Sequence, residues 1–180
     1  VLRAHPMLAG EQIARDQTVA RDHVDQQLPQ LVVHGGRGAA IDGGGKMPDT
    51  KSFTGIGLYA SGRSKVTVKN LRIRGFMTAA KLEKCADWRF ENCDFSDNFD
   101  DPSFGWGDGE RVGGLIVDDS RAISVVECKM MRNWNGIAFR RSDDCSVVRT
   151  NASHCSNVCL KLERTTSSNF LDNDFSYGLR

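Results

Sequence analysis

The chain lacks the sequence features that mark several large classes of protein. It has no run of about 18 apolar residues, so the sequence predicts no membrane-spanning helix. It has no excess of charge of one sign, because its formal net charge is only +1, which argues against a nucleic-acid-binding protein. It has no Cys-x-x-Cys pair, which argues against a structural zinc site. No signal peptide is recognisable, and the chain begins at Val1, so we expect a processed or excised piece of a longer protein.

The chain does contain a short sequence motif, here called the phrase, that recurs five times. The copies span residues 66–73, 88–95, 123–130, 145–152 and 168–175. The equivalent residues Val68, Phe90, Val125, Val147 and Phe170 are 22, 35, 22 and 23 positions apart. A fixed period near 22, broken once by an insertion of about 13 residues, predicts a solenoid that adds one coil per repeat.

Each repeat contains three short apolar stretches, which predict three short strands per coil. Alternation with a period of two places Val66 and Val68 inward. Asn70 and Asn92 follow the first stretch, where a side chain that bonds to nearby backbone suits a turn. Coils of this kind stack in parallel, and parallel crossovers are right-handed by default. The sequence therefore predicts an all-β fold, a single-stranded, right-handed parallel β-helix with about 22 residues per coil.

Most of the six cysteines, Cys85, Cys93, Cys128, Cys145, Cys155 and Cys159, fall at positions that the repeat assigns to the core. Cys93 and Cys128 share a position with Leu71, and Cys145 shares one with Val66. Free cysteine packs as a small hydrophobic side chain, so we expect buried thiols, with a disulfide as the alternative. Buried thiols are compatible with both oxidising and reducing compartments.

The two ends of the chain carry weaker signals. Residues 7–28 place Ile13, Ala20, Val24 and Leu28 near one helical face, so a short helix could cap the first coil. We therefore expect residues 1–30 to be a cap or leader segment and residues 31–180 to form the β-helix. Because the sequence stops at Arg180, where another strand should begin, we expect the β-helix to be truncated there.

The glycine-rich segment 31–45 does not match a nucleotide-binding loop. Ile41 stands where a dinucleotide fingerprint needs its third glycine, and Lys46 is followed by Met47 instead of Ser or Thr. These glycines are better explained as turn residues.

At the level of the family, the chain resembles the pectin-lyase-like superfamily of right-handed parallel β-helices. The resemblance covers about residues 31–180 and is carried by the phrase at residues 88–95, by the strands Gly55–Leu58 and Gly136–Phe139, and by the first coil at residues 40–45. It implies a polysaccharide partner, bound along the outer face of the sheet built from the Gly-Ile-x-Leu strands and walled by long loops. It also implies a secreted or periplasmic protein.

Because successive side chains of a strand point to opposite faces, the sequence predicts which residues lie on the outer face of that sheet. One outward column is predicted to contain Gly57, Lys81, Ile116, Ala138 and Lys161, and the other Tyr59, Glu83, Asp118, Arg140 and Glu163. Strands lie about 4.8 Å apart, so Asp118, Arg140 and Glu163 should be neighbours. The alternative is that these charges only hold the strands in register through cross-strand pairs.

The insertion at residues 97–111 combines carboxylates, glycines and aromatic residues ahead of Asp118. We expect Trp106 to stack on a sugar, and Trp134 and His154 to line the same wall, although His154 taken singly reads as a turn residue. Asp108, Glu110 and Asp119 are candidate Ca²⁺ ligands without the EF-hand spacing, so the cofactor prediction is none or Ca²⁺. Asn151-Ala152-Ser153 is a formal glycosylation sequon.

Three chemistries fit such a face. Elimination from a uronate polymer needs a neutralised carboxylate and a base, which Arg140 and Lys161 beside Asp118 could supply. Hydrolysis needs two carboxylates, with Asp118 and either Glu163 or Asp108 as candidates. The galacturonan hydrolases of the superfamily carry adjacent aspartates ahead of the strand, whereas Asp118-Asp119 comes at its end, so their roles do not transfer. Epimerisation shares the elimination chemistry.

From these observations we expect a polysaccharide-cleaving or modifying protein, with elimination favoured. The predicted catalytic residues are Asp118, Arg140 and Lys161, and the predicted substrate contacts are Tyr59, Lys81, Glu83, Trp106, Trp134, His154 and Glu163. The competing hypothesis is a non-catalytic carbohydrate-binding or assembly module that uses the β-helix as a rod.

Overall fold

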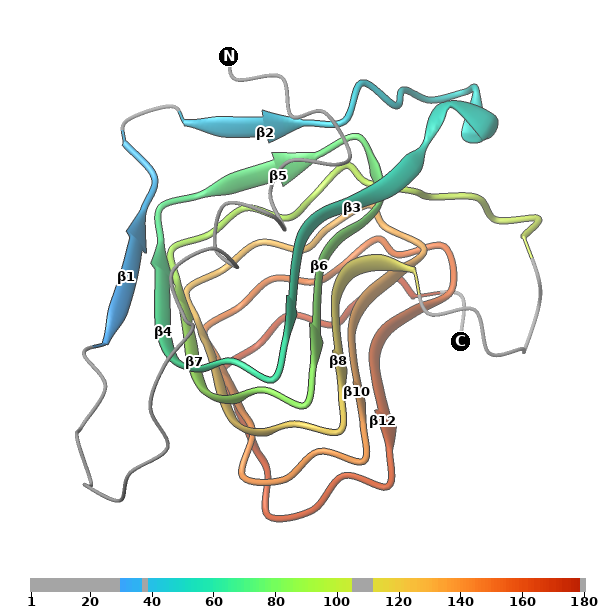
Figure 1. The fold of residues 1–180 in the computed structure, drawn as a ribbon. Coiled ribbons are helices and arrows are strands. Elements are labelled where there is room, and N and C mark those ends of the chain that lie inside the picture. Colours follow the sequence, from blue (N-terminus) through green and yellow to red (C-terminus); the bar gives the residue numbers. More distant parts are fainter. Residues whose placement is uncertain (1–29, 37–38, 105–111, 179–180) are drawn as a thin grey trace, which may run out of the picture.

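The computed structural model describes residues 30–36, 39–104 and 112–178. This part of the chain consists almost entirely of short strands (Figure 1). They are β1 (Leu31–His34), β2 (Ala40–Asp42), β3 (Thr54–Ser61), β4 (Ser64–Lys69), β5 (Arg72–Arg74), β6 (Phe76–Glu83), β7 (Ala86–Glu91), β8 (Gly113–Asp118), β9 (Arg121–Val126), β10 (Asn135–Arg140), β11 (Ser146–Val148), β12 (Val158–Glu163) and β13 (Asn169–Leu171), with one 3-10 turn, η2 (Thr50–Ser52).

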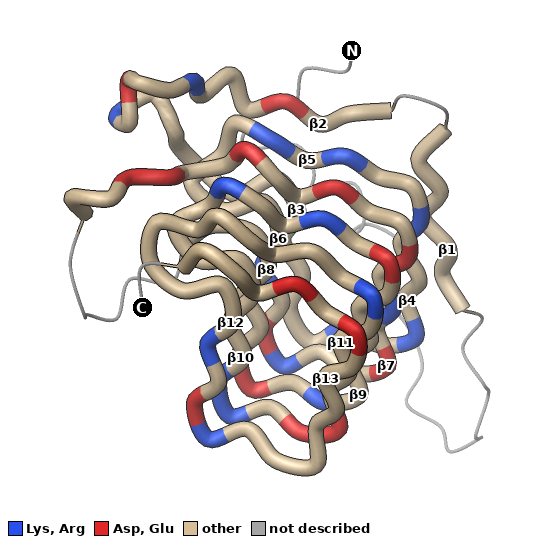
Figure 2. The backbone as a smooth tube through the Cα atoms, turned by 180° about the vertical axis from the view of Figure 1, so that it is seen from behind, with Lys and Arg blue, Asp and Glu red and all other residues tan. Residues whose placement is uncertain are grey.

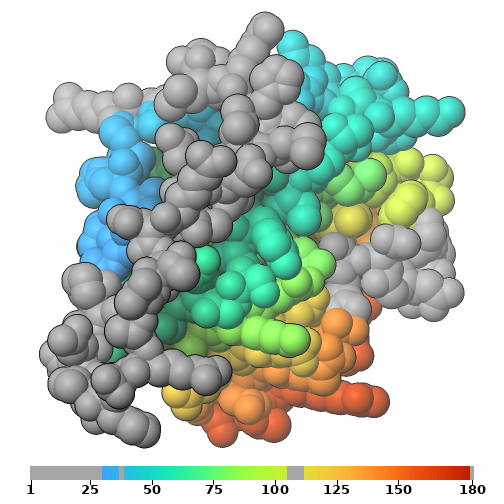
Figure 3. Space-filling model, in the orientation of Figure 1, coloured from blue at the N-terminus to red at the C-terminus, as the bar shows by residue number. Residues whose placement is uncertain are grey.

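The strands form three sheets in which every named strand pair is parallel. Sheet 1 has the order β12-β10-β8-β6-β3, sheet 2 the order β1-β4-β7-β9-β11-β13, and sheet 3 contains β2 and β5. Isolated parallel bridges continue sheet 3 down the molecule through Asp94, Lys129, Asn151 and Asp174. Each strand therefore pairs with its equivalent one coil later, and the coils follow one another in sequence order (Figure 3).

The register of sheet 2 matches the predicted repeat. Val68 pairs with Phe90, Phe90 with Val125, Val125 with Val147, and Val147 with Phe170. The first four of these side chains are completely buried inside the coil. The predicted period of 22 residues and the inward face of these strands are confirmed.

The register of β3 differs from the prediction by two residues. Tyr59 pairs with Lys81, not with Glu83, and Leu58 pairs with Ala80. Ile56, predicted to point inward, is 41% exposed. Ser61, instead of Tyr59, therefore stands beside Glu83 in the outward column.

The reason for this difference lies in the sequence Gly-Ile-Gly-Leu, because either Gly55 or Gly57 can be aligned with the glycine that precedes the inward residues in later coils. The position before the first inward residue is crowded in some coils, since a Cβ atom at Gly136 would lie 2.5 Å from the carbonyl oxygen of Cys159. At Gly57 a Cβ atom would meet the Ile73 side chain at 2.3 Å, whereas nothing lies within 4 Å of one at Gly55. Gly57 is therefore the structural equivalent of Gly136, and Gly55 is not.

The corners that follow the strands share one construction. A residue with a left-handed backbone, such as Lys84, Asn92 or Glu127, precedes a small side chain with a hydroxyl or thiol. That hydroxyl or thiol donates to the carbonyl two residues earlier. In five of these corners it also accepts the N–H of the equivalent residue one coil before, namely at Ser120, Ser142, Cys128, Thr150 and Ser168. The corner side chains of this kind are Cys85, Ser120 and Ser142, then Cys93, Cys128 and Thr150, then Cys145 and Ser168.

All six cysteines are buried and free, which confirms the predicted thiols. Their role goes beyond filling space. The thiol of Cys128 lies 3.4 Å from the backbone nitrogen of Cys93, whose N–H it accepts, and it donates to the carbonyl of Val126 at 3.3 Å. All six cysteine thiols thus take part in hydrogen bonds that link one coil to the next or fix a corner within a coil.

The predicted capping helix at residues 7–28 lies outside the described residues. Among residues 30–36, 39–104 and 112–178, no helix has the length and apolar character that crossing a bilayer requires.

Candidate functional site

The outer face of sheet 1 carries two columns of side chains, two residues apart along each strand. The pairing gives Tyr59, Lys81, Ile116, Ala138 and Lys161 in the first column, and Ser61, Glu83, Asp118, Arg140 and Glu163 in the second. We call the six charged members, Lys81, Glu83, Asp118, Arg140, Lys161 and Glu163, the charged strip. Successive members of a column stand on strands about 4.8 Å apart.

The centre of the charged strip is an ion pair between Asp118 and Arg140. The two residues are cross-strand partners, and Arg140 Nε lies 3.2 Å from Asp118 Oδ1. Asp118 is only 5% exposed, and Arg140 Nε is buried without a hydrogen bond of good geometry. A buried carboxylate needs a compensating cation, so Asp118 holds the guanidinium of Arg140 in place.

The N-terminal part of the strip is occupied by its own contacts. Glu83 accepts a hydrogen bond from the Tyr59 hydroxyl at 2.6 Å and forms an ion pair with Lys81 at 2.7 Å. The bonds from Lys81 and then Tyr59 lower the pKa of Glu83, and the bond to Glu83 raises the pKa of Tyr59. Glu83 is therefore held as a carboxylate, which makes it unsuited to donate a proton.

The C-terminal part of the strip is open. Lys161 is half-buried and Glu163 is exposed, and neither forms an ion pair with another described residue. Both lie on β12, one strand beyond the pair of Asp118 and Arg140. Ile116 and Ala138, in the first column between Lys81 and Lys161, are 0% and 2% exposed. Lys161 and Glu163 are the charged groups of the strip with free capacity for a ligand.

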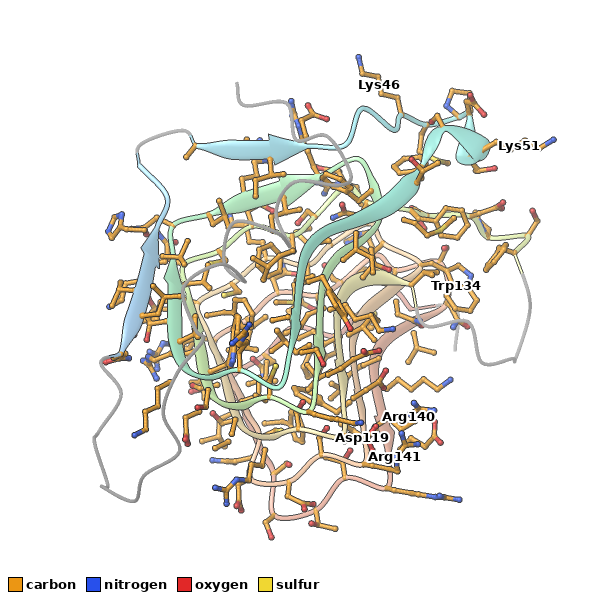
Figure 4. The ribbon with its side chains drawn as sticks, viewed as in Figure 1. Lys46, Lys51, Asp119, Trp134, Arg140 and Arg141 are labelled. Atoms are coloured by element: carbon orange, nitrogen blue, oxygen red, sulfur yellow. The ribbon has the colours of Figure 1, made fainter. Side chains whose placement is uncertain are left out.

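The insertion ahead of β8 builds a second small core. Phe99, Phe104 and Trp134 pack edge to face, with ring centroids 4.9 and 5.3 Å apart, and Phe53 joins them from the first coil. Trp134 is 2% exposed and donates its indole N–H to the carbonyl of Phe104. It therefore offers no face to a sugar, contrary to the expectation, and it lies away from Arg140 (Figure 4).

The remaining expected substrate contacts are placed as follows. Trp106 lies outside the described residues. His154 is exposed in the turn before β12, with a left-handed backbone (φ 58°), and its ring stacks on Tyr177 at 4.6 Å. Lys161 and Glu163 lie in the C-terminal half of that strand, so the structure does not bring His154 into the charged strip.

The three candidate Ca²⁺ ligands do not form a described site. Asp108 and Glu110 lie outside the described residues. Asp119 is bound by Arg141 at 2.5 and 2.6 Å, which lowers the pKa of the Asp119 carboxyl. The part of the chain that the structure describes contains no cluster of three His, Cys, Asp or Glu side chains suited to a metal. Because Asp119 is committed to Arg141, it does not fit the role of a calcium ligand.

Sequence reasoning also missed a buried carboxyl in the insertion. Burial raises the pKa of Asp100, and its Oδ1 atom lies inside the molecule without a hydrogen-bond partner. Asp100 lies next to Phe99, on the wall built by the second core, and not in the charged strip. The sequence signal for this burial is the neighbouring aromatic residue Phe99.

Comparison with known proteins supports the fold. A search of curated sequences finds no match for the chain. Among solved structures, a crystal structure of a candidate glycosyl hydrolase from Parabacteroides merdae superposes with a TM-score of 0.57, at 12% identity, over 79% of this chain and 70% of that one. At this identity the likeness shows the fold alone.

The family assignment comes from the sequence itself. The family described as the right-handed β-helix region matches residues 54–178, which include β3 to β13. This match agrees with the three parallel sheets, with the 22-residue coil and with the resemblance drawn from the repeat. The chain belongs to the right-handed β-helix family.

Proposed function

We propose that the charged strip binds an acidic polysaccharide, one with uronate units, and cleaves it by β-elimination. The observation that supports this best is the arrangement of two basic side chains, Arg140 and Lys161. Arg140 is held by Asp118, while Lys161, diagonal to it on the next strand, has no ion pair with a described residue. Elimination from a uronate needs one group that neutralises the carboxylate and one that takes the neighbouring proton. The fixed cation and the free amine match these two needs.

In the proposed reaction, Arg140 binds the uronate carboxylate through its outer nitrogens, with Asp118 as its positioning residue. The neutralised carboxylate makes the proton on the adjacent carbon more acidic. Lys161, in its uncharged form, takes that proton, a carbon–carbon double bond forms, and the glycosidic carbon–oxygen bond on the next carbon breaks. The leaving oxygen takes up a proton, so the products are a new chain end and an unsaturated uronate.

The test is incubation with a panel of uronate polymers, followed by the ultraviolet absorbance of the unsaturated product. Lys161→Met removes the amine and keeps much of the side-chain volume, so we expect the rate to fall about 10²–10⁴-fold. The matched control is Arg141→Ala, because Arg141 is exposed, bonds to Asp119 and lies outside the strip. Equal rates for these two variants would contradict the assignment of Lys161.

A second candidate is hydrolysis at the same strip. Asp118 and Glu163 stand on either side of Arg140, two strands apart, or about 9.6 Å. Inverting glycosidases place their carboxyls about 6.5–9.5 Å apart. New reducing ends without ultraviolet absorbance, abolished in Glu163→Gln, would favour this chemistry. Retardation on polysaccharide affinity gels without any product would favour a binding module instead. For all three functions we propose a secreted or periplasmic location, where such polymers occur.

A further inference from the structure

A hollow lies on a different side of the molecule from the charged strip. It is located where sheet 2 turns into sheet 3 in the first three coils, and its volume is about 340 Å³. Sheet 3 and its bridges carry basic and acidic residues side by side (Figure 2). The hollow is lined by Ala39, Ala40, Asn70, Leu71, Arg72, Arg74, Asn92 and Asp94. Small-molecule sites start at about 300 Å³, so it has room for one sugar ring.

The hollow adjoins an irregularity in the repeat. His34 pairs with Lys69 and Ala40 pairs with Arg72, so residues 35–39 join the strands of the first coil where Asn70 and Leu71 alone suffice in the second. The first coil therefore has three more residues at this corner than the second coil. A departure from a strict repeat is a common place for binding sites.

The amides beside the hollow have unused capacity. Asn92 donates to Asn70 Oδ1 at 2.7 Å, and Asn70 Nδ2 lies 3.2 Å from His34 Nε2. Among the described residues, Asn92 Oδ1 has no hydrogen-bond partner, and Asn92 is exposed. An exposed amide oxygen next to a fixed amide row can accept a hydroxyl donor.

The two arginines of the hollow differ in how firmly they are held. Arg74 donates twice to Asp42, at 3.1 and 3.0 Å. Arg72 has longer contacts, with Nε 3.5 Å from Asp94 and Nη2 3.4 Å from Asp97. The guanidinium of Arg72, 41% exposed, therefore keeps donors for a further anionic group.

We propose that this hollow is a second carbohydrate site that takes one carboxylated sugar unit. Arg72 would bind the sugar carboxylate, and Asn92 and Asp94 its hydroxyls. A carboxylated sugar fits better than a simple oxyanion, because only the sugar also brings hydroxyl groups that can donate to the Asp94 carboxylate beside Arg72. This inference takes from the proposed function only the class of ligand, a uronate-containing polysaccharide. It adds a second binding site for that polysaccharide, away from the charged strip.

The experiment titrates the protein with galacturonate as a free monosaccharide and follows the side-chain amide signals of Asn70 and Asn92 by NMR. We expect saturable shifts of both amides, no such shifts with glucose, and at least tenfold weaker binding in Arg72→Gln. The matched control is Arg149→Gln, which removes an arginine from the same edge of the β-helix, paired with Glu127, outside the hollow. Absence of shifts with galacturonate, equal shifts with glucose, or unchanged binding in Arg72→Gln would each overturn the proposal.

Repeating the titration with Arg140→Ala separates this proposal from the proposed function. That variant alters the charged strip only, so the shifts at Asn70 and Asn92 should persist. Shifts at the hollow in a protein that cleaves no uronate polymer would refute the cleavage proposal alone. Cleavage without those shifts would refute the second site alone.

Discussion

Replacing Cys128 by valine tests whether the buried thiols act as hydrogen-bonding groups. Valine nearly matches cysteine in size but cannot accept the N–H of Cys93, now 3.4 Å from the sulfur. Both residues are 2% exposed, so water cannot replace the lost partner. An unsatisfied buried donor costs about 1–3 kcal/mol. For a domain of this size each kcal/mol lowers the melting temperature by about 2–4 °C.

Cys128→Ser is the matched variant, because serine already occupies the same kind of corner at Ser120 and Ser142. Its hydroxyl can accept from Cys93 and donate to Val126, so we expect a loss within about 1 kcal/mol. Thermal unfolding by circular dichroism gives the order of stability, and amide exchange at Cys93 reports the bond directly. If the valine variant were as stable as the serine variant, with equal protection of that amide, the thiol would be only a space-filling group.

Three further predictions concern the insertion and the glycines. Trp134→Ala should destabilise the protein by about 3–5 kcal/mol in urea unfolding, because it removes the largest side chain of the second core. A loss of stability no greater than that of a surface substitution would contradict this role. Asp100→Asn should raise stability at neutral pH. Burial raises the pKa of Asp100 in the folded state, so stability is lost as the pH rises through that pKa, and the uncharged amide removes this loss. The melting temperature should therefore depend less on pH in the variant. Gly136→Ala should cost about 1–3 kcal/mol in the same unfolding assay, since its Cβ would lie 2.5 Å from the Cys159 carbonyl oxygen, whereas Gly36→Ala meets nothing within 4 Å and should be neutral.

The fold could be predicted because a solenoid repeats one packing problem many times. Val68, Phe90, Val125 and Val147 occupy one position in successive coils, and a spacing near 22 leaves few alternatives. The prediction of the register was wrong at β3, the first strand of sheet 1. Two glycines in this strand, Gly55 and Gly57, fit the sequence pattern of the repeat equally well. The choice between Gly55 and Gly57 depends on the close approach of Ile73, which is a contact across the coil and not a local property.

The residues of the charged strip could be predicted wherever the register of sheet 1 was predicted correctly. Alternation placed Asp118 beside Arg140, and the structure adds that Asp118 is buried. Trp134 could not be placed in this way, because an exposed and a buried tryptophan in a loop look alike in sequence. Its burial depends on Phe99, which stacks on it from the coil before, and on Phe104, which comes from an insertion that has no counterpart in the other coils.

The corner hydrogen bonds have a consequence for how such a protein can change in length. Corner side chains such as Ser120 and Cys128 donate within their own coil and accept from the coil before, so they join a coil to its predecessor. Cysteine, serine and threonine all serve in that join, as Cys128, Ser120 and Thr150 show. A whole coil can therefore be removed or duplicated while the new neighbours meet through the same bonds. The unit of variation in this fold is the coil, and the site on its outer face can be lengthened by one strand at a time.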